Sequence, residues 1–314
     1  MKSPAFRTVS ILLLAAVVLL AALCVSSPAM AEDWLPDLTS FVETPIDQLA
    51  GPMPSYQYYE SDLCYSDPTI RVEITTDRYC DTPMYIANVS LADASQMRTM
   101  LAGSYISKRT TLATTLAKRG NAVLAINGDY YCYDNAGLVV RQGVEYRCNG
   151  DGRYDVLMID EAGDFHIVLN ADKETLNSAY QALGGAYTKG GHVMQGLTFG
   201  PAYIVDGKPA HDVYTRPDNR TGHTAQRMAI AQIGRLEYRI YCCEGPDNTN
   251  SRGLTLPEMA EYIARDTDVL QAYNLDGGSS ACMIFRDEKI NARSTAKNRS
   301  IPDILYFITG YVGE

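Results

Sequence analysis

The chain has 314 residues, of which 46% are hydrophobic and 20% are charged, and its formal net charge is −10. This length and composition are those of one large or two small globular domains. A surface this acidic argues against nucleic acid or an anionic membrane as a partner, although a few local arginines can still hold an anionic substrate.

The first 31 residues have the features of an export signal. Lys2 and Arg7 precede the apolar stretch 11–25, and residues 29–31 (Ala-Met-Ala) supply the small side chains needed for cleavage after Ala31. The apolar stretch is shorter than the roughly 18 residues of a membrane-spanning helix, so a retained anchor is the second interpretation. We therefore predict a secreted or extracytoplasmic protein with no stable membrane insertion after cleavage.

Seven cysteines remain after cleavage. In an exported chain, disulfides are expected more often than metal ligands. The expected pairs are Cys64 with Cys80, Cys132 with Cys148, and Cys282 with either Cys242 or Cys243, which leaves one free thiol.

The N-terminal part predicts an extended leader followed by a hairpin and a buried strand. Residues 32–59 are rich in Pro, Asp and Ser, whereas 69–75 and 84–91 alternate as half-buried strands do. A helix is expected over 111–118, where Gly120 suits its end. The continuous apolar run 122–126 predicts a strand that is buried on both faces.

Further strands follow, with little helix between them. Two short strands are expected within 138–146, a hairpin over 155–168, a helix near 177–182, a strand in 199–208 and an antiparallel pair over 227–241.

The C-terminal part predicts a capped helix and two strands. Thr255 and Glu258 have the spacing of a capping box for a helix over 256–266, which precedes strands at 269–275 and 301–308. Many strands with few helices indicate an α+β fold with a large mixed or antiparallel sheet. We predict a single domain after a signal peptide, divided as 1–31 (signal), 32–83 (leader and first strands) and 84–314 (main domain).

Polar residues follow the buried strand 122–126. Asn127, Gly128 and Asp129 lie at its end, where an unpaired amide or carboxylate would cost several kcal/mol. These side chains must therefore either pair with each other or contact a ligand.

A second polar turn follows strand 269–275. Asp276 is followed by Gly277 and Gly278, which allow the backbone to approach a ligand, and then by Ser279 and Ser280. The carboxylate can accept a proton or hold a sugar hydroxyl, and the free amides can bind an anion. The alternative is an ordinary turn capped by the Asp side chain.

An ordered series of motifs resembles the phosphodiester glycosidase family across roughly 84–307. The motifs are 125–131 (AINGDYY), 199–201 (FGP), the strand at Arg227, 252–256 (RGLTL) with its helix, 274–278 (NLDGG) with Ser280, and the segment at Arg299. Two departures are Ser279, where the family usually has a third glycine, and Asp129, where it often has a glycine.

This resemblance implies cleavage of the bond between an anomeric carbon and a phosphodiester. That chemistry requires carboxylates near the sugar and cations near the phosphate. Arg227 and Arg299 are the candidates for phosphate, and Asp276 and Asp129 for nucleophile or base, with Glu145 in reserve. Each has a structural alternative: an arginine at a strand start is often a surface ion pair, and Glu145 fits a solvent-facing strand position.

The expected partner is a sugar phosphate or an envelope or exopolysaccharide glycan, and the candidate binding residues are Asn127, Gly128, Arg227, Gly277, Gly278, Ser279, Ser280 and Arg299. We expect no cofactor, with Ca²⁺ or Mg²⁺ on the acidic side chains as an open alternative. The competing hypothesis is a non-catalytic glycan-binding or envelope scaffold protein. The sequence does not indicate the oligomeric state.

Overall fold

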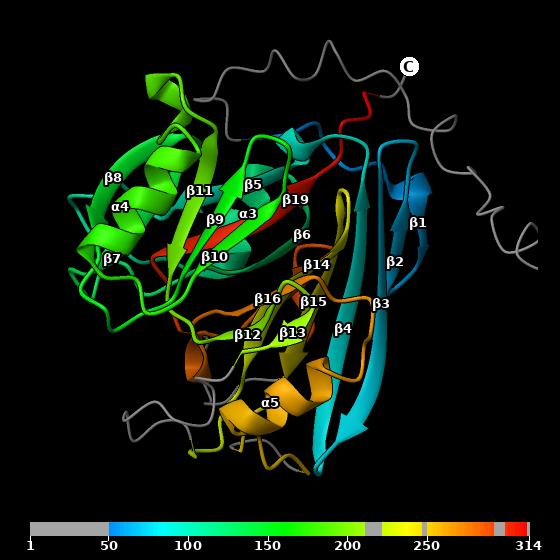
Figure 1. Cartoon of the computed structure of the whole chain (residues 1–314). Coiled ribbons are helices and arrows are strands. Elements are labelled where there is room, and N and C mark those ends of the chain that lie inside the picture. Colours follow the sequence, from blue (N-terminus) through cyan, green and yellow to red (C-terminus); the bar gives the residue numbers. More distant parts are fainter. Residues whose placement is uncertain (1–49, 211–221, 247–249, 292–298, 313–314) are drawn as a thin grey trace, which may run out of the picture. The chain divides into compact units, whose positions relative to one another are not determined.

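Antiparallel strands form most of the fold in the computed structural model, which describes residues 50–210, 222–246, 250–291 and 299–312 (Figure 1). The largest sheet has nine strands. In spatial order they are β1 (Tyr59–Ser61), β2 (Cys64–Ser66), β3 (Ile70–Tyr79), β4 (Thr82–Leu91), β15 (Glu237–Cys243), β14 (Met228–Gly234), β16 (Gln271–Asn274), β12 (Ala202–Val205) and β13 (Lys208–Pro209).

Two five-stranded sheets complete the described part of the fold. The second sheet has the order β10 (Phe165–Val168), β9 (Val156–Asp160), β11 (Val193–Thr198), β7 (Gly137–Arg141) and β8 (Val144–Asn149). The third has the order β18 (Glu288–Lys289), β17 (Met283–Phe285), β6 (Ala122–Asn127), β19 (Asp303–Ile308) and β5 (Met97–Leu101).

Within the described ranges, one α-helix packs against each sheet. The helix α5 (Leu256–Ile263) packs with side chains of β4, β12, β14 and β15, whereas α3 (Ala113–Gly120) covers the third sheet and α4 (Lys173–Ala182) the second. The opposite faces of the sheets share one large apolar cluster, to which all three sheets contribute. Short 3₁₀ turns occur at η1 (Tyr56–Tyr58), η2 (Ala94–Gln96), η3 (Tyr187–Lys189) and η5 (Gly278–Ser280).

The predicted α+β class is confirmed, although the strands form three sheets instead of one. The strand β6 is buried at all six positions, because it pairs with β17 and β19 and has apolar clusters on both faces. The capping box of Thr255 and Glu258 begins α5 as expected. The helix α4 begins earlier than predicted, at Lys173, because Asp172 caps it with Thr175.

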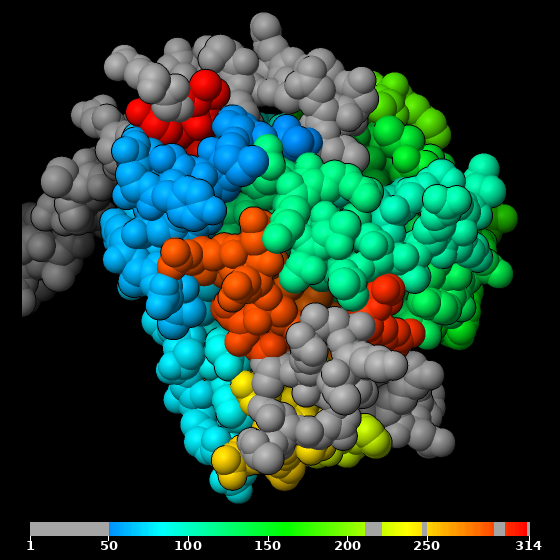
Figure 2. Space-filling model, turned by 180° about the vertical axis from the view of Figure 1, so that it is seen from behind, coloured from blue at the N-terminus to red at the C-terminus, as the bar shows by residue number. Residues whose placement is uncertain are grey.

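The predicted signal peptide and most of the predicted leader lie outside the described ranges. The domain divisions at residues 31 and 83 stay predictions. Of the leader, the structure describes residues 50–59, which include η1 and the first residue of β1. Seen from behind, β18 and the turn before it lie at the surface between the N-terminal strands and the segment that contains α3 (Figure 2), whereas β17 is buried. No helix in the described ranges is long and apolar enough to cross a membrane.

The predicted disulfides are not formed, since each cysteine in the described ranges is a free thiol. Cys64 pairs with Glu73 across β2 and β3, so Cys80 lies seven residues farther along, about 20 Å away. A disulfide requires Cα atoms within about 7 Å. Spacing along the chain therefore misled this prediction, because strand register separates the two residues.

The other two predicted disulfides fail because the side chains face different clusters. Cys132 packs with Val139 on one face of β7, whereas Cys148 joins the cluster under α4 on the other face. Cys282 lies in the cluster covered by α3, while Cys242 lies in the central core and Cys243 under α5. None of these pairs is bonded in the described ranges.

Candidate active site

The ends of β6 and β16, which belong to different sheets, meet at Asn127. Its side-chain amide donates to the backbone carbonyl of Asp276 at 2.7 Å, and its Oδ1 accepts from the Cys282 amide at 3.1 Å. The side chain is 1% exposed. Asn127 thus links the two polar turns that the sequence analysis singled out, and it holds the Asp276 turn in place.

Glycine is required in this turn for two different reasons. A Cβ on Gly277 would lie 2.8 Å from the carbonyl oxygen of Gln226, so a side chain would push the turn away from β14. Gly278 has a φ of +57°, which favours glycine, and a Cβ there would meet nothing within 4 Å. One side of the turn is therefore packed, whereas the side at Gly278 faces open space.

The Asp276 carboxyl group is 8% exposed beside this open side. Burial raises its pKa to about 6, although the Ser280 hydroxyl, the Arg299 charge and the Gly277 amide favour the carboxylate. The nearby Asp129 charge adds to the rise. A carboxyl group with this pKa can exchange a proton near neutral pH, as a general acid or base must.

Asp129 lies in a buried ion network instead of facing an open site. Its Oδ1 accepts from Arg141 at 2.9 Å and from the Tyr131 amide at 3.0 Å, and its Oδ2 accepts from the Thr198 amide at 2.9 Å. The side chain is fully buried. Since both oxygens are occupied, the geometry favours a structural role over that of nucleophile or base.

Arg141 and Asp303 complete this network, and the sequence analysis did not single them out. Arg141 donates from Nε and Nη2 to the same oxygen of Asp303, at 3.0 Å and 2.6 Å. The other oxygen of Asp303 is buried and has no hydrogen-bond partner. Burial raises the pKa of Asp303 to about 7 against the effect of Arg141, with further increases from Asp129 and Asp276.

Gly128 makes room for this network. A Cβ at Gly128 would lie 2.5 Å from the Asp303 carboxylate, and the Gly128 amide donates to the Asp303 carbonyl at 3.1 Å. Gly128 is thus a packing position next to Asp303, and its contact with substrate stays a prediction.

The two candidate phosphate-binding arginines lie in different environments. Arg227 is 8% exposed, and its guanidinium donates to the backbone carbonyls of Leu254, at 2.9 Å, and His223. Arg299 is exposed, and its Nη1 lies 3.5 Å from the Ser279 hydroxyl. Arg299 is therefore the arginine at the open side of the turn, whereas Arg227 supports the turn from behind Gly277.

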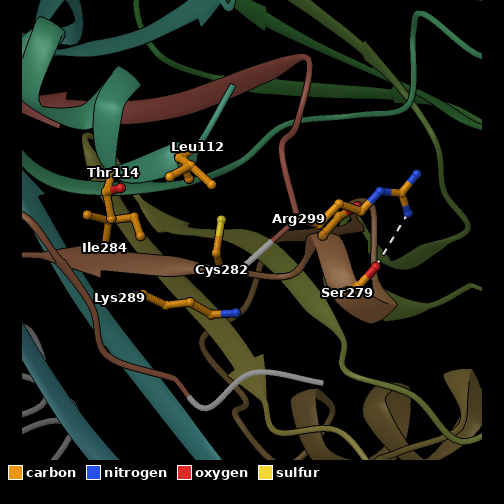
Figure 3. A pocket seen from close by; sticks show the side chains of 9 residues that line it. Leu112, Thr114, Ser279, Cys282, Ile284, Lys289 and Arg299 are labelled. Atoms are coloured by element: carbon orange, nitrogen blue, oxygen red, sulfur yellow. Dashed lines mark hydrogen bonds between the residues drawn. The ribbon is translucent and has the colours of Figure 1, made fainter. Parts of the chain in front are cut away.

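A pocket opens beside the turn, between the start of α3 and β17 (Figure 3). Ser279 and Arg299 are at one side, and the figure shows the hydrogen bond between them. Lys289 contributes a second cation and Ser280 a hydroxyl group. The remaining lining consists of Leu112, Ala113, Thr114, Cys282 and Ile284. The pocket has a volume of only about 10 Å³, the space of about one water molecule, so it has no room for a phosphate or a sugar.

Glu145 does not join the site. Its carboxylate accepts from the Tyr180 hydroxyl of α4 at 3.0 Å and from Lys189 at 3.1 Å. Both partners lie on the side of β8 that faces α4. No group of three or more His, Cys, Asp or Glu side chains in the described ranges is arranged to hold a metal ion.

A sequence profile of the phosphodiester glycosidase family matches residues 120–308, which is more than half of the chain. The chain belongs to the phosphodiester glycosidase family. The matched range includes β6, Arg141, the Asp276 turn and Asp303. A search of curated proteins returns no match.

Solved structures share the fold at low sequence identity. The catalytic domain of zebrafish N-acetylglucosamine-1-phosphodiester alpha-N-acetylglucosaminidase, auto-inhibited by its pro-peptide, is 14% identical with a TM-score of 0.60. The comparison covers 83% of this chain and 87% of the zebrafish chain. A hypothetical protein from Synechocystis is 12% identical with a TM-score of 0.55, over 80% of this chain and 64% of that one.

Proposed function

We propose that this family member hydrolyses the glycosyl–phosphate bond of a sugar-1-phosphodiester, of N-acetylglucosamine type or from an envelope or exopolysaccharide glycan. The observation that carries the proposal is the buried Asp276 carboxyl group, whose pKa lies near 6, on a glycine turn that is open at Gly278. Arg299 and Ser279 flank the same open side. This arrangement provides a carboxylate for the sugar and a cation for the phosphate.

In this reaction Asp276 acts at the anomeric carbon, as nucleophile or as base toward water. The C1–O bond to phosphate breaks, the oxygen of water joins C1, and the phosphate leaves as a monoester. Arg299 lies at the open side of the turn, where its positive charge stabilises the departing phosphate. The free sugar and the phosphate monoester are the products, and together they contain the added water.

The proposal is tested by incubating the protein with UDP-N-acetylglucosamine or a simple N-acetylglucosamine-1-phosphodiester and measuring the release of free sugar and of the phosphate product. Release of both products by the wild-type protein supports it. Failure to cleave a panel of glycosyl phosphodiesters, with glycan binding retained, would favour the scaffold hypothesis.

The pH dependence of this activity follows from Asp276. Its pKa is raised to about 6, so the reactive carboxylate is lost as the pH falls through that value. We expect kcat/KM to decrease about tenfold per pH unit below pH 6 and to be constant just above it. A pH–rate profile measures this, and an acid limb near pH 4 would show that the reactive group is not a buried carboxyl.

Glu145→Gln tests the reserve candidate. Since the Glu145 carboxylate binds Tyr180 and Lys189, we expect kcat/KM to stay within about twofold of the wild-type value. Steady-state kinetics with the same phosphodiester measure this. A loss of 100-fold or more would return Glu145 to the list of catalytic residues.

We also propose that the protein works outside the cytoplasm. The charged, apolar and small residues of 1–31 support this, and they lie outside the described ranges. N-terminal sequencing of the mature protein would show whether the chain begins at Glu32.

A further inference from the structure

Aromatic side chains gather beside Arg299. Tyr130 and Tyr133 belong to the loop after β6, and their rings are stacked with centroids 4.3 Å apart. Phe199, which follows β11, contacts Tyr130 edge-on at 6.3 Å. Tyr133 is 51% exposed, whereas its neighbour Tyr131 is 1% exposed and faces the core. We call Tyr130, Tyr133 and Phe199 the aromatic platform.

Arg299 connects this platform to the candidate active site. Its guanidinium carbon lies 5.8 Å from the centre of the Tyr133 ring, and its Nη1 reaches the Ser279 hydroxyl. Partial burial alone would lower the pKa of Arg299, but hydrogen bonding to the hydroxyl groups of Tyr133 and Tyr130 raises it. The Arg299 side chain therefore contacts both the aromatic platform and the Asp276 turn.

The loop that carries the platform is held in place before any ligand binds. Arg147 of β8 donates from Nη1 to the carbonyl oxygens of Tyr131, at 3.1 Å, and Asp134, at 2.5 Å. These carbonyls lie on both sides of Tyr133. The Asp134 carboxylate also accepts from the Tyr154 hydroxyl at 2.7 Å. A fixed loop loses little conformational entropy on binding, which favours a ligand-binding role for its exposed ring.

We propose that the aromatic platform is a sugar subsite, on which a pyranose ring next to the scissile phosphate stacks its apolar face. An aromatic ring with a polar hydroxyl suits a ligand that has an apolar C–H face and a hydroxylated edge. Arg299 beside the platform supplies the charge that a phosphate attached to this sugar requires. The inference rests on the proposed function, and it assigns specificity for the sugar to the loop after β6.

Binding to a turnover-deficient protein tests the platform without relying on hydrolysis. UDP-N-acetylglucosamine and UDP are titrated calorimetrically into Asp276→Asn, with and without Tyr133→Ala. We expect Tyr133→Ala to weaken binding of the sugar nucleotide about fivefold to tenfold and to change UDP binding by less than twofold. Tyr133→Phe should keep most of the affinity for the sugar nucleotide, because it keeps the ring and loses only the hydroxyl group that is bonded to Arg299.

Tyr187→Ala is the matched control, since Tyr187 is 42% exposed and lies in η3, outside the platform. Equal weakening of UDP-N-acetylglucosamine and UDP by Tyr133→Ala would show that Tyr133 acts only through Arg299, and it would overturn the inference. An unchanged affinity for the sugar nucleotide would also overturn it.

The two proposals fail in different ways. If the wild-type protein cleaves no phosphodiester but sugar binding still depends on Tyr133, the subsite stands and the catalytic function fails. If the wild-type protein turns over and Tyr133→Ala leaves KM unchanged, the function stands and the subsite fails.

Discussion

Asp276→Asn is expected to reduce kcat by about 10²–10⁴-fold and, at pH 8, to raise the melting temperature. The first effect follows because an amide can neither accept the proton nor attack the anomeric carbon. The second follows from burial, which raises the pKa of Asp276 from 3.8 to about 6. That rise corresponds to an upper bound of about 3 kcal/mol of unfolding free energy lost at high pH.

The sign of the stability effect depends on pH. Because the folded-state pKa is the higher one, the folded protein binds this proton more tightly than the unfolded chain does. The destabilising effect of the carboxylate is absent below about pH 4, grows between pH 4 and 6, and is complete at pH 8. The stability gain of Asp276→Asn should therefore disappear near pH 4.

Calorimetric melting curves of the wild-type protein and Asp276→Asn at pH 4 and pH 8 measure this difference. Ser279→Ala is a useful control, since Ser279 is in the same turn but has no charge to titrate. A lower melting temperature for Asp276→Asn at pH 8 would mean that the carboxylate stabilises the turn, contrary to its burial.

Arg141→Met is expected to destabilise the protein by about 3–5 kcal/mol. Arg141 is 3% exposed and is paired with two fully buried carboxylates. Removing the guanidinium leaves Asp129 and Asp303 buried without their cation, which costs far more than the lost hydrogen bonds. Urea denaturation followed by circular dichroism measures the change.

Arg153→Met is the matched control, because Arg153 also bridges two aspartates, Asp134 and Asp151, but is 58% exposed. We expect it to cost between about 0 and 1 kcal/mol. A triple variant, Asp129→Asn with Arg141→Met and Asp303→Asn, should recover much of the stability lost in Arg141→Met. Equal costs for Arg141→Met and Arg153→Met would contradict the burial argument.

The strand ends of the site were predictable because polar residues at the tip of a buried strand need partners. This argument found Asn127 and the Asp276 turn, and the structure brings them together. It also predicted that Asp129 must pair or bind a ligand. The sequence could not name Arg141 as the partner, because that choice depends on how two sheets pack together.

Asp303 was missed for the same reason. It begins an apolar strand, where one acidic residue gives no local signal, and its partner Arg141 lies 162 residues earlier. An arginine that ends the buried run 137–141 was a usable signal, since charged residues are almost never buried unless they are paired. The disulfides failed because spacing along the chain contains no information about register or the face of a sheet.

The Asp129–Arg141–Asp303 network also has a consequence for how the protein unfolds. Arg141 belongs to the second sheet, and Asp303 to the third. If these sheets separated while each kept its own structure, ions of opposite sign would remain on two newly exposed apolar surfaces. Partly folded intermediates with only one sheet are therefore disfavoured at neutral pH, and the two sheets are expected to melt in a single cooperative transition.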